Sequence, residues 1–176
     1  MRGFACQSRL TAVCHLQPVR VMADTITRIR ILTAVAPDTI DRVGRILAGH
    51  DLQIVTTLAK AKSTLDADGV GLVFVGARFD DSRMFDLIDL IRKDLVKKKI
   101  PIVAAIVTPT KLSKTAIAGL SHSVKIFGAT LFVNLNDFPD DAIGNARVRL
   151  IVDTVVLPPD IVEDLTPPPL RNPPRK

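Results

Sequence analysis

Two adjacent carboxylates, Asp80 and Asp81, follow an apolar run of strand length and are the side chains of this chain best suited to chemistry. Carboxylate oxygens bind divalent cations, and the loop after a strand is where sheets of α/β proteins bind ligands. A phosphate or metal site is therefore one interpretation. The other, which we favour, is that both residues are solvated and that Asp81 or Ser82 caps the helix that follows.

The remaining reactive or charged groups are isolated from one another along the chain. Lys97, Lys98 and Lys99 could contact nucleic acid, but a basic run at the end of a helix also complements the helix dipole. His122 is expected on the surface of a helix. The three histidines lack sequence-level partners for a nucleophilic site, and no glycine-rich phosphate loop follows the first predicted strand. We therefore expect no enzymatic activity, no cofactor and no metal ion.

Length and composition fit a single small domain. The chain has 176 residues, of which 47% are hydrophobic, which is enough to form a core. Apolar runs stay shorter than the roughly 18 residues of a membrane-spanning helix, so we expect no contact with a membrane. The net charge of +6 falls to +3 between residues 22 and 157, where 18 basic residues face 15 acidic ones. Such a modest charge disfavours nucleic acid as a partner.

The two ends of the chain differ from its middle. Residues 1–23 contain both cysteines, Cys6 and Cys14, and no periodic apolar pattern. Three interpretations stay open for them: a misassigned start upstream of Met22, a targeting peptide, or a flexible arm. Residues 158–176 hold seven of the twelve prolines and are expected to form a disordered tail. The cysteine-free middle suits a reducing cytoplasm, where we expect the protein to reside.

From residue 28 onward, apolar patterns typical of strands and of helices alternate. The expected strands span residues 29–34, 52–57, 70–75, 101–106 and 130–133. The expected helices run from Asp38, as the cap, to Gly49, over 60–66, around 85–95, within 111–127 and over 140–157. Five such alternations predict an α/β domain over residues 24–157. Its core is a doubly wound, five-stranded parallel sheet in the order 2-1-3-4-5.

One stretch of this pattern is similar to a known family. Residues 72–92, read as a buried strand, a short loop and an amphipathic helix, resemble the third strand and third helix of response-regulator receiver domains of two-component signalling. Gly128 to Asn136 resembles the Gly-Ala-x-x-aromatic segment of the same family, with Phe132 at the aromatic switch position. The resemblance implies the fold shared by receivers and flavodoxins and a role in phosphorelay signal transduction.

The functional positions of the family carry other residues in this chain. The acidic pair, the phospho-acceptor aspartate, the hydroxyl and the phosphate-pairing lysine are replaced by Val35 and Ala36, Gly76, Ile106 and Leu135. Asn136 stands where the family has a proline in a cis bond, which would cost a non-proline residue about 2.5–4 kcal/mol. We therefore predict a degenerate receiver, or pseudo-receiver, that accepts no phosphoryl group and binds no metal.

The last predicted helix has more apolar residues than the single stripe needed to pack on a sheet. Receivers commonly pair through the face of helix four, strand five and helix five, so the resemblance implies a homodimer or a partner surface there. The candidate contacts are Phe132, Val148, Ile151 and Val155. The alternative is that helix five packs deeper because a long helix four covers it.

Two functions remain open from the sequence. The first is a stand-alone pseudo-receiver that contacts another signalling protein independently of phosphorylation. The second is a flavodoxin-like domain that binds a small ligand or nucleic acid at the carboxyl edge of the sheet, through Pro37, Gly76, Asp80 and the loop of residues 107–109. The apolar residues at the degenerate positions favour a filled edge, and so the first function.

Overall fold

The computed structural model describes residues 28–67, 69–109 and 111–156. The expected arm (1–23) and Pro-rich tail (158–176) lie outside these residues. The described strands are β1 (Arg30–Ala34), β2 (Asp51–Val55), β3 (Leu72–Gly76), β4 (Ile102–Ile106) and β5 (Leu131–Asn134). They form one five-stranded sheet in the order β2-β1-β3-β4-β5, and all paired strands are parallel. The predicted sheet is therefore confirmed.

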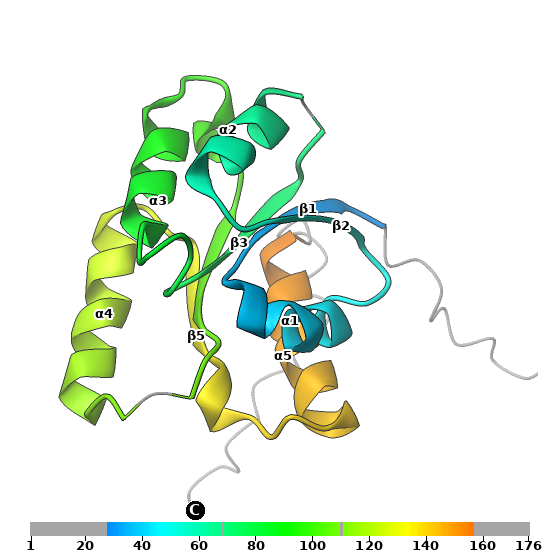
Figure 1. The fold of residues 1–176 in the computed structure, drawn as a ribbon, viewed down its shortest axis with the longest axis vertical. Helices are drawn as coiled ribbons and strands as arrows, with labels where there is room; N and C mark the ends of the chain where they lie inside the picture. The colour runs from blue at the N-terminus through cyan, green and yellow to red at the C-terminus, as the bar shows by residue number, and fades with distance from the viewer. Residues whose placement is uncertain (1–27, 68, 110, 157–176) are drawn as a thin grey trace, which may run out of the picture.

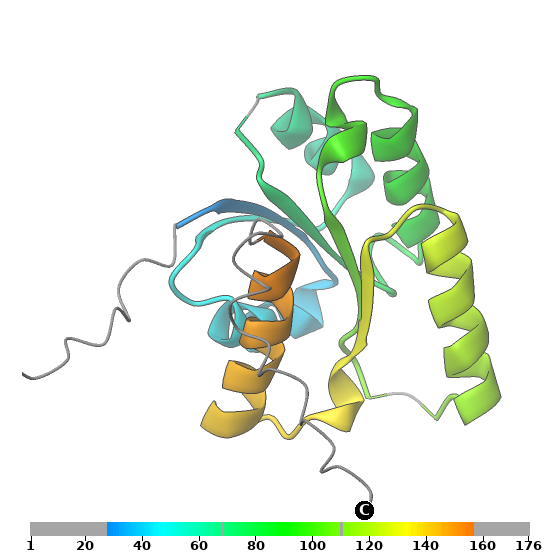
Figure 2. The same ribbon diagram turned by 180° about the vertical axis from the view of Figure 1, so that it is seen from behind.

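Helices cover both faces of this sheet (Figures 1 and 2). The α-helices in the described ranges are α1 (Ile40–Ile46), α2 (Leu58–Asp66), α3 (Met84–Lys93), α4 (Lys114–Ile126) and α5 (Ala142–Val156). The described residues also include three short 3-10 helices, η1 (Pro37–Thr39), η2 (Lys97–Lys99) and η3 (Leu135–Asp137). Among the described helices, none combines the length and the apolar content of a membrane-spanning segment.

The central strands β3 and β4 are buried along their whole length, because helices lie over both of their faces. Successive side chains of a strand point to opposite faces. Val73 and Val75 therefore join one core with α2, α3 and α4, whereas Leu72 and Phe74 join a second core with α1 and α5. We call these the α2/α3/α4 core and the α1/α5 core.

Two predicted helix caps are wrong. Residues 37–39 form η1 ahead of α1, and Asp38 makes no capping hydrogen bond there. Asp81 and Ser82 do not cap α3, whose first turn follows Arg83 without a side-chain cap. The loop before α3 instead takes the left-handed conformation at Asp80, Asp81 and Ser82, with φ of 43°, 54° and 74°.

The position of α5 excludes the alternative in which α4 covers it. Val148 and Val152 of α5 lie in the α1/α5 core, while Val124 of α4 lies in the α2/α3/α4 core on the other side of the sheet. Helix α4 therefore does not cover α5. The buried residues of α5 pack instead against the sheet and α1, which accounts for part of its broad apolar surface.

Candidate functional site

The carboxyl ends of β1, β3, β4 and β5 lie at one edge of the sheet, because the strands are parallel. Val35 follows β1, Gly76 ends β3, Ile106 ends β4, and Leu135 begins η3 directly after β5. The structure therefore brings together the positions at which the receiver resemblance places the phosphorylation chemistry. Ala36, the next residue after Val35, is half-buried at the same edge.

Apolar groups surround Gly76. A methyl group on its Cα would lie 3.6 Å from Val35 Cγ1 and 3.7 Å from Val107 Cγ2. Val35, Val107 and Leu135 belong to the α1/α5 core, and Ile106 is only 2% exposed. The Cβ of an aspartate introduced at Gly76 would therefore contact apolar side chains.

The edge is only partly filled, since a cavity of about 480 Å³ remains over Gly76. Its lining comes from the segments that follow β1, β3 and β4 and from α4, and is formed by Ala36, Thr39, Gly76, Ala77, Arg78, Ser82, Ile106, Val107, Thr108, Lys111, Leu112 and Leu120. Of the degenerate positions, Ala36, Gly76 and Ile106 line the cavity, whereas Val35 and Leu135 are fully buried beside it. The expected filling is thus correct for Val35 and Leu135 and incomplete over Gly76.

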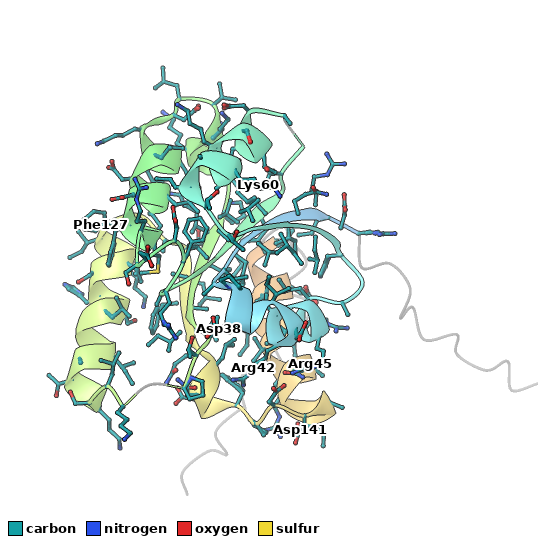
Figure 3. The ribbon with its side chains drawn as sticks, in the orientation of Figure 1. Asp38, Arg42, Arg45, Lys60, Phe127 and Asp141 are labelled. Atoms are coloured by element: carbon teal, nitrogen blue, oxygen red, sulfur yellow. The ribbon has the colours of Figure 1, made fainter. Side chains whose placement is uncertain are left out.

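Charged residues stand at the mouth of this cavity. Arg78 and Lys111 are among its lining residues. Arg78 Nη1 lies 3.5 Å from Asp38 Oδ2, and both side chains are more than half exposed. Asp38 is on η1, where the chain leaves β1 (Figure 3). Arg78 and Lys111 were not predicted as site residues from the sequence. Each follows the carboxyl end of a predicted strand within a few residues, and that placement is the signal that could have found them.

Asp80 and Asp81 do not form part of this cavity. The Asp80 carboxylate accepts a hydrogen bond of 2.8 Å from the backbone N–H of Leu58, the first residue of α2. It therefore serves as a tertiary cap for α2. Asp81 is exposed. In the part of the chain that the structure describes, no group of three or more His, Cys, Asp or Glu side chains could hold a metal ion.

The loop between β5 and α5 is fixed by side chains from other elements. Arg42 Nη2 donates to the carbonyl oxygens of Leu135 at 2.8 Å and Phe138 at 3.0 Å. Asn136 Nδ2 donates to the carbonyl oxygen of Thr108 at 3.2 Å, at the cavity wall. The described peptide bonds, including that of Asn136, are trans. Figure 3 shows Arg42 and Arg45 on α1 beside the start of α5.

The interface candidates are only partly at the surface. Val148 is 1% exposed, so its assignment as a surface contact is wrong. Ile151 and Val155 are half-buried against the α1/α5 core, and Phe132 is half-buried against the α2/α3/α4 core. The large apolar side chains that α5 does expose are Ile143 and Leu150, each at 65%.

Comparison with solved structures places the fold among response regulators. A response regulator from Hahella chejuensis matches with a TM-score of 0.57 and 18% identity, over 73% of this chain and 95% of that one. The receiver domain of NtrX from Brucella abortus matches with a TM-score of 0.55 and 23% identity, over 72% and 97%. The chemotaxis protein CheY4 of Vibrio cholerae matches with a TM-score of 0.56 and 15% identity, over 74% and 99%.

The chain has the receiver fold. At these identities the likeness establishes the fold alone. No protein-family model matches the sequence, and no curated protein matches it either. In this receiver fold, Gly76 is the last residue of the third strand and stands over the apolar wall described above.

Proposed function

We propose that this chain is a pseudo-receiver of bacterial signal transduction that acts by contact with another protein, independently of phosphorylation. The observation that carries the proposal is the apolar carboxyl edge of the sheet, where Gly76 lies against Val35 and Val107. Transfer of a phosphoryl group requires a nucleophile and groups that neutralise the transferred charge. At this edge the corresponding positions hold a glycine and aliphatic side chains.

The test of phosphorylation uses acetyl phosphate with magnesium, and a phosphorylatable receiver as the positive control. Intact mass should stay unchanged for this chain and rise for the control. A ligand at about 100 times its Kd would add about 2.7 kcal/mol to the free energy of unfolding. Because we expect no magnesium site in this chain, its melting temperature should stay unchanged when magnesium is added. A phosphorylated mass, or a clear rise in melting temperature with magnesium, would overturn the proposal.

For the contact surface, we propose the side of the domain formed by α4, β5 and α5, with a homodimer as the expected assembly. Strand β5 is at the edge of the sheet, with α4 over one face and α5 over the other (Figure 2). Ile143 and Leu150 are seven residues apart, so they share one side of α5. Both are exposed, and exposed apolar groups are plausible contact sites.

A pair of substitutions in α5 tests this surface. Leu150→Glu should give a smaller particle by light scattering and leave the melting temperature nearly unchanged, because Leu150 is 65% exposed. Val148→Glu is the matched control, since it adds the same charge two residues away but into the α1/α5 core. It should lower the melting temperature strongly. An assembly that survives both Leu150→Glu and Ile143→Glu would exclude this face of α5 from the contact.

A further inference from the structure

The cavity over Gly76 is lined in part by Leu120 of α4, but Ile143 and Leu150, the exposed residues of the contact surface proposed above, do not line it. We propose that it binds a small organic anion, a compound with an apolar body and a single carboxylate or sulfonate group. This inference stands on the cavity alone and does not depend on the signalling function.

The size and lining of the cavity fit such a ligand. Its volume of about 480 Å³ lies within the range of about 300–1,000 Å³ that small-molecule sites occupy. The wall is largely apolar, with Ala36, Ile106 and Leu120 contributed by three different segments. Gly76 leaves part of the β3 backbone without a side chain, which keeps the space open. An aliphatic chain or an aromatic ring would lose its contact with water there.

The charges at the mouth favour an anion. Arg78 is paired with Asp38 at 3.5 Å, whereas Lys111 makes no ion pair with any residue that the structure describes. Arg78 and Lys111 together outweigh Asp38 by one positive charge. Thr108 also lines the cavity, and its backbone carbonyl oxygen accepts a hydrogen bond from Asn136 Nδ2. An anionic group at the mouth would therefore meet two cations while its apolar body fills the cavity.

The proposal is tested by measuring the binding of octanoate to the full chain, by calorimetry and by the change in melting temperature. Octanoate should bind saturably at one site and raise the melting temperature. Octan-1-ol, which has the same body without the charge, should bind roughly two- to tenfold more weakly. Inorganic phosphate, which has charge without an apolar body, should not bind. Tighter binding of octylammonium than of octanoate would overturn the choice of an anion.

Substitutions locate the site and fix the sign of the charge effect. Lys111→Gln should weaken octanoate binding roughly two- to fivefold. Lys114→Gln, which removes the same charge from the first residue of α4 outside the cavity lining, should leave it unchanged. Asp38→Asn should tighten binding, because it removes a repulsive charge and frees Arg78. Since Asp38 is more than half exposed, this variant should fold normally.

A third kind of variant fills the cavity. Ala36→Leu places a larger side chain in the lining and should abolish octanoate binding without lowering the melting temperature, because Ala36 has an extended backbone that leucine adopts readily. Unchanged binding in Ala36→Leu, or weaker binding in Asp38→Asn, would overturn the proposal. An equal loss of octanoate affinity in Lys111→Gln and Lys114→Gln would also overturn the proposal, because the loss would then reflect the net charge of the protein and not a contact at the cavity.

Discussion

At the scale of the residue, Gly76 determines what chemistry the carboxyl edge can support. A Cβ at this position meets Val35 and Val107 at ordinary contact distances. Gly76→Ala should therefore change the free energy of unfolding by less than about 1 kcal/mol, and could raise it by restricting the unfolded chain. Gly76→Asp adds a carboxylate to the same place and should cost about 1–3 kcal/mol relative to alanine at neutral pH. Chemical denaturation of both variants checks the difference.

The pH dependence of this difference tests its cause. Burial raises the pKa of a carboxyl group because it disfavours the charged form. A folded pKa above the unfolded one means that the aspartate variant loses stability as pH rises through the folded pKa. The difference in the free energy of unfolding between Gly76→Asp and Gly76→Ala should thus become smaller at acid pH. A gap that is constant with pH would show that the new carboxylate is solvated, for example by turning into the cavity.

At the scale of the element, α1 and the turn that follows it offer a matched pair of glycines. Gly44 lies inside α1, and a Cβ there would have no atom within 4 Å. Gly44→Ala should raise the free energy of unfolding by about 0.5–1 kcal/mol, since glycine disfavours helix. Gly49 has φ of 104° and equally open surroundings. Gly49→Ala should lower stability by about 1 kcal/mol or more, through backbone strain alone. Equal effects of the two substitutions in thermal denaturation would contradict this account.

Local sequence predicts the elements of this protein better than their ends. The strands and their order follow from apolar runs separated by helical periods, because parallel strands must be buried on both faces. Helix caps can come from residues far away in the sequence. Asp80 caps α2, and no local sequence pattern relates Asp80 to Leu58. Val148 was misplaced for a similar reason, since a helix with apolar residues on several sides does not reveal which side meets the sheet. The cavity depends on side chains from several loops at once.

At the scale of the whole molecule, ion pairs between separate elements predict how stability responds to acid. Hydrogen bonding to Arg30 of β1 lowers the pKa of Asp51 in β2, and hydrogen bonding to Arg45 of α1 lowers the pKa of Asp140 before α5. A folded pKa below the unfolded value of 3.8 stabilises the fold above that pH, and the contribution is lost as pH falls through the folded pKa. The melting temperature should therefore fall below about pH 4.

Asp140→Asn provides the control for this acid response. The variant should have a lower melting temperature than the parent at neutral pH. Its melting temperature should fall less on acidification, so that the melting temperatures of variant and parent converge at low pH. Both pairs are exposed, so added salt should weaken the difference between parent and variant. Parallel melting curves for parent and variant across the acid range would mean that Asp140 contributes nothing to the acid response.

The three left-handed residues between β3 and α3 have a consequence for the order of folding. Asp80, Asp81 and Ser82 would not favour this conformation in an isolated chain. Two tertiary contacts anchor the loop: Phe79 is buried in the α2/α3/α4 core, and the backbone N–H of Leu58 donates to Asp80, which requires α2 to be in place. We predict that this loop forms late in folding, so that substitutions within it speed unfolding while leaving the folding rate unchanged.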